Sequence, residues 1–114
     1  MPSPVAPSFS TEYFTALLDG VTAARNVLAQ MASPAAEVAE RLLAGGRLFI
    51  ASARPDFVSE GFVRSGGLML LEECGADGSG PGPGDAVLLG WTDTEPEAEQ
   101  MLFSRLAESG SFIV

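Results

Sequence analysis

Two short polar stretches combine side-chain hydroxyls or a cation with the backbone amides of a predicted helix start, which is a combination that binds anions. Each stretch follows a predicted buried strand, and ligands of open parallel sheets bind beyond the carboxyl ends of the strands. A helix N-terminus also attracts negative charge. The candidate ligand-binding residues are Ser52, Ala53, Arg54, Thr92, Asp93 and Thr94.

The same residues also have structural interpretations. Acidic residues crowd the second helix start, where they stabilise the helix dipole and would repel a phosphate. Thr94 with Glu97 three residues later matches a capping box, so we favour capping over phosphate binding for the threonines. Arg54 stands two residues before Asp56, and an ion pair on the surface is the more common role for such an arginine. The acidic residues are Asp93, Glu95, Glu97 and Glu99.

The chain contains no histidine and a single cysteine, Cys74. Catalysis by Ser-His-Asp or Cys-His groups, histidine metal sites, an intramolecular disulfide and a cysteine-rich zinc site are therefore excluded. An enzyme built on this chain would need carboxylates, Tyr13, Cys74 or an external cofactor. We expect no metal and no cofactor.

Composition narrows the partners. The chain has 114 residues, of which 46% are hydrophobic, and its net charge is −9 with arginine as its only basic residue type. That charge argues against nucleic acids and anionic membranes as partners, because the chain has too few cationic side chains to neutralise their many phosphates. No apolar run approaches the length of a membrane span, and the N-terminus lacks the basic and apolar regions of a signal peptide. We expect a cytoplasmic protein.

Hydrophobic spacing and turn residues predict helices and strands in alternation. Two helices come first, over 10–31 and from Ser33 as N-cap and Pro34 as first helical residue to Gly45. Strands are predicted over 47–52, 68–73, 86–91 and 111–114. Further helices are predicted over 56–65 and from Thr94 to Gly110, and residues 74–85 form a loop rich in glycine and proline.

Strands separated by crossover connections predict a mostly parallel sheet of about four strands with helices on both faces. The predicted fold class is α/β, a three-layer α/β/α sandwich preceded by an N-terminal helical segment. We expect a Pro-rich arm over residues 1–9 and a single domain over residues 10–114.

Four segments, TEYFTALLDGV, AAEVAERLLAGGRLFIAS, EGFVRSGGL and PGPGDAVLLG, appear in the order and spacing of the sugar isomerase (SIS) domain family. The chain resembles most the uncharacterised phosphosugar-binding members of that family, from about Ser8 onward. The resemblance implies a flavodoxin-like parallel α/β/α sandwich that is usually dimeric and binds phosphorylated sugars. Some members of the family interconvert aldose and ketose phosphates.

The ligand loops depart from the family pattern. Ala51-Ser52-Ala53 stands in place of a Gly-x-Gly turn, Thr92-Asp93-Thr94-Glu95 stands in place of a serine-rich loop, and a further strand and closing helix of the family are missing. We therefore expect an SIS-like phosphosugar-binding domain with degenerate loops that acts as a non-catalytic binding or regulatory module.

Two alternatives stay open. One is an aldose–ketose phosphosugar isomerase similar to phosphoheptose isomerase, in which Glu60 would carry the proton between adjacent carbons. Glu60 also lies four residues before Arg64, where a solvated ion pair is the structural alternative. The other is a dimerisation module without a ligand. We expect a sugar phosphate as the small-molecule partner and a homodimer formed through the N-terminal helices.

Overall fold

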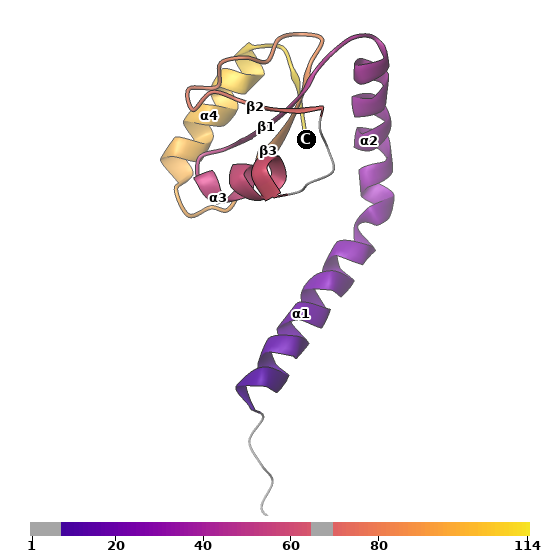
Figure 1. Cartoon of the computed structure of the whole chain (residues 1–114), viewed down its shortest axis with the longest axis vertical. Helices are drawn as coiled ribbons and strands as arrows, with labels where there is room; N and C mark the ends of the chain where they lie inside the picture. Colours follow the sequence, from indigo (N-terminus) through magenta and orange to yellow (C-terminus); the bar gives the residue numbers. More distant parts are fainter. Residues whose placement is uncertain (1–7, 65–69) are drawn as a thin grey trace, which may run out of the picture. The chain divides into compact units, whose positions relative to one another are not determined.

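The computed structural model describes residues 8–64 and 70–114, and it has mixed α/β architecture (Figure 1). The first seven residues of the predicted arm lie outside the described residues, as do residues 65–69, which include the end of the predicted third helix and the start of the predicted second strand. The elements are α1 (Phe9–Asn26), α2 (Leu28–Leu43), β1 (Leu48–Ser52), α3 (Pro55–Val58), the π-helical turn η1 (Ser59–Arg64), β2 (Leu71–Glu73), β3 (Ala86–Gly90), α4 (Pro96–Glu108) and β4 (Phe112–Ile113).

The four strands form one sheet in the order β2-β1-β3-β4, and every neighbouring pair is parallel. The predicted parallel sheet is thereby confirmed. β1 and β3 form its centre, pairing along five residues from Leu48 opposite Ala86 to Ser52 opposite Gly90. Both strands are apolar runs, as expected for strands that are covered on both faces.

Alternate residues of β1 point to two separate apolar clusters. Phe49 and Ala51 pack with Leu102 and Leu106 of α4 on one face. Leu48 and Ile50 pack on the opposite face, where their partners include Val38 and Leu42 of α2 and Val58 of α3. Burying a side chain of this size contributes about 1.5–3 kcal/mol, so the two clusters supply most of the driving force for folding this region.

The loop over residues 74–85 connects β2 to β3 and therefore crosses β1, which lies between them. It runs on the face that α4 covers. A Cβ at Gly80 would come within 3.1 Å of the Phe49 ring, and a Cβ at Gly78 within 3.0 Å of Arg105. Both glycines also have positive φ, of 116° and 84°, which other residues rarely adopt. The glycine content of the loop thus reflects a close approach to the sheet and to α4.

Two predicted helix boundaries are wrong. The first break falls at Val27, where φ is −102° and ψ is 3°, and Pro34 lies inside α2 with helical residues on both sides. Pro34 removes the hydrogen bond that the Gln30 carbonyl would accept, but it does not end the helix. By their internal contacts, residues 1–33 and 34–114 form two separate compact units, and the change from one to the other falls at this proline.

The helix predicted over residues 56–65 is also shorter and less regular than expected. It consists of four α-helical residues, α3, followed directly by η1. A Cβ at Gly61 would overlap the Ile50 side chain, so this turn lies directly against β1. A side chain at this position would have to displace the terminal methyl group of Ile50.

Candidate functional site

Both candidate stretches begin at the carboxyl ends of the parallel strands, on the same side of the sheet. β1 and β3 are neighbours with Ser52 opposite Gly90, so the stretch 52–54 and the stretch 91–95 leave the sheet side by side. The connections from these two strands also leave in opposite directions, because β2 and β4 lie at opposite edges of the sheet. The carboxyl ends of β1 and β3 therefore form the switch point at which open parallel sheets bind ligands.

The second stretch binds an anion that is a side chain of the protein, the Glu99 carboxylate. Glu99, one turn inside α4, is only 2% exposed. Its Oε1 accepts hydrogen bonds from the Thr92 backbone N–H at 3.2 Å and from the Thr92 hydroxyl at 2.8 Å, and its Oε2 accepts one from the Asp93 N–H at 3.0 Å. The donors that the sequence suggested for an external anion are bonded to this internal one.

The backbone turns sharply at Asp93 to present these amides. Asp93 has a φ of 60°, the left-handed region that aspartate tolerates better than most residues. Its side chain accepts a hydrogen bond from the Trp91 indole N–H. Trp91 in turn makes an edge-to-face contact with Phe103 of α4, with ring centroids 6.4 Å apart. The turn is thus anchored to α4 by an aromatic pair as well as by Glu99.

The predicted capping box is wrong. α4 begins at Pro96 with Glu95 as N-cap, and no side chain caps it. A residue before proline avoids the helical region, so Glu95 cannot be the first helical residue that a box starting at Thr94 requires. The Thr94 hydroxyl instead lies 2.7 Å from the Thr92 hydroxyl.

The first stretch is bonded within itself. The Ser52 hydroxyl donates to the Arg54 carbonyl, and the Arg54 guanidinium pairs with the Asp56 carboxylate at 3.5 Å. The surface ion pair favoured for Arg54 is therefore present. On the sheet face covered by α3, a Cβ at Gly90 would come within 2.6 Å of the Phe57 ring, so that ring covers the end of β3.

Ser52 and Ala53 line a pocket of about 180 Å³ between the end of β1 and α4. Its lining includes Arg105 but not Thr92, Asp93 or Thr94. Ser52 also lines a second pocket of about 160 Å³, on whose wall Cys74 lies. The structure places the two candidate stretches at one edge, yet it gives them different neighbours.

The remaining candidates for chemistry lie elsewhere. Glu60 belongs to η1, is exposed, and is absent from the lining of both pockets beside Ser52. The Cys74 thiol is buried and donates to the carbonyls of Gly75 and Ser79 at 3.4 and 3.5 Å. Burial, and secondly the charge of Asp77, raise the pKa of the Cys74 thiol. A raised pKa disfavours the nucleophilic thiolate.

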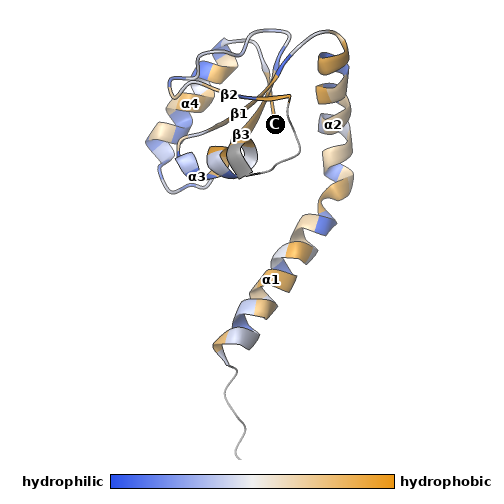
Figure 2. Ribbon diagram, viewed as in Figure 1, coloured by the Kyte–Doolittle hydropathy of each residue, from blue (hydrophilic) through white to orange (hydrophobic). Residues whose placement is uncertain are grey.

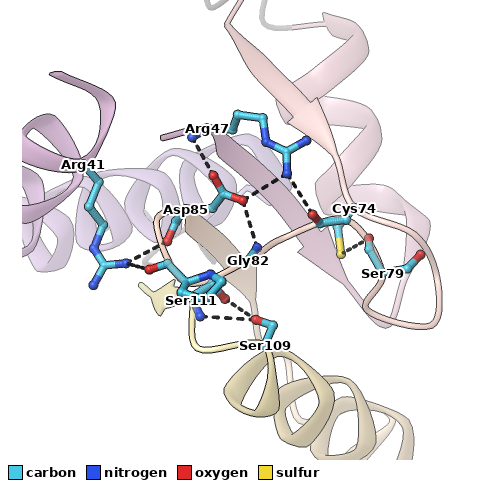
Figure 3. Close-up of polar contacts among 10 residues, drawn as sticks. Arg41, Arg47, Cys74, Ser79, Gly82, Asp85, Ser109 and Ser111 are labelled. Carbon is cyan, nitrogen blue, oxygen red and sulfur yellow. Dashed lines mark hydrogen bonds and ion pairs between the residues drawn. The ribbon is translucent and has the colours of Figure 1, made fainter. Parts of the chain in front are cut away.

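At the amino ends of the strands, Asp85 connects the turn before β1 to the turn before β3 (Figure 3). Its carboxylate accepts hydrogen bonds from the backbone N–H groups of Arg47 and Gly82, each at 2.8 Å, and from the Arg47 guanidinium at 3.1 Å. Arg41 of α2 donates to the carbonyls of Pro83 and Asp85 at 2.8 and 3.1 Å. The Gly-Gly-Arg and Pro-Gly-Asp segments that carry part of the SIS resemblance thus form one structural junction.

The side chain of Asp85 is almost fully buried, and burial alone would raise the pKa of its carboxyl. The hydrogen bonds from the Arg47 and Gly82 amides, together with the Arg47 guanidinium, outweigh burial and hold the pKa below its usual value. Asp85 is therefore ionised at neutral pH and works as an acceptor for three donors.

Comparisons with known proteins add no relative. No protein-family model, curated protein or solved structure matches the chain. Within residues 8–64 and 70–114, no three acidic or cysteine side chains are grouped so that they could hold a metal ion. Among the same residues, no helix has the length and apolar character needed to cross a membrane.

Sequence reasoning missed Glu99 and Asp85. Glu99 follows three other acidic residues at the helix start, but unlike them it is spaced three and seven residues from both buried leucines, Leu102 and Leu106. That spacing places a carboxylate on the buried face of an amphipathic helix, which is the signal that marks it. The Pro-Gly-Asp motif indicates a turn at Asp85. It does not indicate the partner of Asp85, because Arg47 is distant in sequence.

Proposed function

We propose that this chain is a non-catalytic binding or regulatory module of SIS-like, three-layer α/β/α type, in which the Glu99 carboxylate occupies the anion position. The observation that carries the proposal is the buried Glu99 carboxylate and its three hydrogen bonds to Thr92 and Asp93. A carboxylate presents two oxygens to these donors much as a phosphate would. The internal group therefore replaces the ligand that the loop would otherwise bind.

Electrostatics support this assignment. A phosphate about 4 Å from the Glu99 carboxylate would meet a repulsion of about 4 kcal/mol per unit charge at an effective dielectric constant of about 20. Glu97 lies in the same first turn of α4 and adds to the negative field. The donors are already paired, so a phosphate could gain no hydrogen bond there without displacing Glu99.

The first stretch supports the same conclusion. Ala51 and Ala53 carry Cβ atoms where a Gly-x-Gly turn would bring bare backbone to a phosphate. The Ser52 hydroxyl donates to the Arg54 carbonyl, and Phe57 covers Gly90 at the end of the neighbouring strand. Neither stretch presents a prepared set of donors to solvent.

The SIS-like architecture rests on the resemblance of the sequence together with the sheet order β2-β1-β3-β4. The packing of α4 on one face, and of α2 and α3 on the other, supports three layers.

A second candidate function is residual binding of a sugar phosphate in the 180 Å³ pocket beside Ser52. One observation favours it, since Arg105 lines this pocket and brings a cation near the Ser52 hydroxyl. Against it, ligand pockets of small-molecule sites usually measure about 300–1,000 Å³. Arg105 also donates a hydrogen bond to the Asp77 carbonyl at 3.2 Å.

Thermal unfolding with a panel of sugar phosphates and inorganic phosphate tests both candidates. We expect the wild-type protein to show no stabilisation. Glu99→Ala should lose about 2 kcal/mol of stability, because two amides and a hydroxyl lose their acceptor. The same variant should gain stability from inorganic phosphate, whereas Glu97→Ala, in the same helix turn, should do neither.

Three outcomes would decide against the proposal. Stabilisation of the wild type that disappears in Thr92→Ala would show that the loop still binds ligands. Stabilisation that disappears in Ser52→Ala or Arg105→Ala, and not in Thr92→Ala, would favour the second candidate. A Glu99→Ala variant that folds but is not stabilised by phosphate would show that Thr92 and Asp93 do not form an anion position.

A further inference from the structure

A pocket of about 350 Å³ lies between α4 and the carboxyl ends of β3 and β4. Its volume falls in the range of about 300–1,000 Å³ that is typical of small-molecule sites. The two pockets beside Ser52 are about half that size, at about 180 and 160 Å³. All the residues that line the larger pocket belong to the unit 34–114. They are Leu89, Trp91, Gln100, Phe103, Ile113 and Val114.

The floor of this pocket is aliphatic and belongs to the packed sheet. Leu89 of β3 and Ile113 of β4 are partly buried against the apolar cluster that includes Leu102 and Leu106 of α4. Figure 2 shows hydrophobic and hydrophilic residues along α4, as expected for a helix that covers the sheet with one face. An apolar ligand in the pocket would complete the burial of Leu89 and Ile113, and the removal of apolar surface from water favours binding.

Two aromatic rings form a wall that contacts within the chain hold in place. Trp91 and Phe103 are 44% and 40% exposed, and their rings meet edge to face with 84° between the ring planes. The Trp91 indole N–H donates to the Asp93 carboxylate, so its polar atom is paired and the rest of its ring is apolar. A wall that is fixed in advance lowers the entropy cost of binding, and aromatic ligands can pack against both rings.

The charges around the pocket favour a neutral ligand. Among the residues that the structure describes, no charged side chain lines the pocket. Asp93 is bonded to the Trp91 indole, and Glu97 lies one turn before Gln100 on the same side of α4. An anion would be repelled by these carboxylates, and a cation would lose hydration without a charged partner in the lining.

Gln100 adds a polar group to this apolar lining. Its amide nitrogen lies 3.5 Å from the Ser104 hydroxyl, and within the described part of the chain its side-chain oxygen accepts no hydrogen bond. A ligand with an N–H or O–H group can donate to that oxygen. We propose that the pocket binds a small neutral aromatic molecule that carries a hydrogen-bond donor. This inference does not depend on whether Glu99 occupies the anion position.

Three probes with the same double ring test the proposed chemistry on the full chain. They are 1-naphthol, which is neutral and carries a donor, 1-methoxynaphthalene, which lacks the donor, and naphthalene-1-sulfonate, which is an anion. The indole N–H resonance of Trp91, the only tryptophan, reports binding by nuclear magnetic resonance. It should move saturably with 1-naphthol, with a Kd on the order of 0.1–1 mM, and the sulfonate should bind at least about tenfold more weakly.

Two variants and a matched control locate the bound probe. Val114→Phe keeps the backbone hydrogen bonds of Val114 with Val87 and Leu89 but places a ring in the pocket, so 1-naphthol should bind at least about tenfold more weakly. Gln100→Leu should weaken 1-naphthol by about threefold to tenfold and leave 1-methoxynaphthalene unchanged. Met101→Ala removes an exposed apolar side chain of α4 that does not line this pocket, and it should bind as the wild type does.

Thermal unfolding followed by circular dichroism shows that each variant is folded. Affinity for 1-naphthol that is unchanged in Val114→Phe would place the probe elsewhere and overturn the proposal. Equal affinities for 1-naphthol and the sulfonate would overturn the requirement for a neutral ligand. An affinity that falls as the protein concentration rises would show that a second copy of the chain occupies the pocket, and would overturn the proposal as well.

Discussion

At the scale of residues, the two most informative carboxylates serve the fold. Asp85 binds three donors at one edge of the sheet, and Glu99 binds three at the other. Arg47 and Asp85 belong to two of the segments that resemble a family of ligand-binding proteins, but the sequence singled out neither residue. In the structure, Arg47 donates hydrogen bonds to the Asp85 carboxylate. Residues of a sequence motif can thus hold two turns of a fold together.

The lowered pKa of Asp85 makes a prediction about acid stability. A carboxyl whose pKa is lower in the folded state stabilises the protein above its unfolded pKa of about 3.9, and this contribution is lost as the pH falls through the folded value. Asp85→Asn should therefore be less stable than the wild type by about 2 kcal/mol at pH 7. The difference should shrink as the pH falls below about 4.

Urea unfolding from neutral pH down to about pH 2 measures this difference. Asp56→Asn is the control, because Asp56 forms an exposed ion pair with Arg54 and should change stability little. A difference between the wild type and Asp85→Asn that stays constant over this range would refute the assigned role.

At the scale of elements, the sequence predicted the four strands and their parallel pairing well, because buried apolar runs bounded by glycines are a strong signal. It failed at helix boundaries, where weak local signals compete. Thr94 and Glu97 indicated one helix start, whereas Pro96 requires another, and the constraint that proline places on Glu95 prevailed. Pro34 indicated a start, but the helix continues through it.

The turn between α2 and β1 contacts the loop that precedes β3, and the two segments offer a matched pair of glycines. A Cβ at Gly46 would overlap the Gly84 carbonyl oxygen and lie 2.8 Å from that of Arg41, whereas a Cβ at Gly84 has no neighbour within 4 Å. Gly46→Ala should cost about 3 kcal/mol, because backbone on both sides must move. Gly84→Ala should leave stability nearly unchanged.

Thermal or urea unfolding of the two variants compares them directly. Equal stability of Gly46→Ala and Gly84→Ala would show that the Gly-Gly-Arg and Pro-Gly-Asp turns do not approach as closely as described.

At the scale of the whole molecule, the chain contains two units with different sources of stability. The apolar clusters that hold the sheet are formed by residues from 38 to 113, all within the unit 34–114. The unit 1–33 has no buried residue among those described. The sequence showed the amphipathic helix over this unit, but periodicity does not identify what covers an apolar face.

We therefore expect residues 34–114 to fold without residues 1–33. Pro34 then becomes a favourable first residue of the shortened helix. Thermal unfolding should show a cooperative transition within a few degrees of the transition of the full chain. A fragment without such a transition, with the full chain as the reference, would show that the N-terminal unit contributes to the core.

The central claim is that Glu99 occupies the anion position at the edge of the sheet. The most direct test follows the backbone amide resonances of Thr92 and Asp93 by nuclear magnetic resonance while fructose 6-phosphate or inorganic phosphate is added to about 10 mM. The account predicts that both resonances stay in place in the wild type and move with phosphate in Glu99→Ala. A saturable movement of both resonances in the wild type would contradict it.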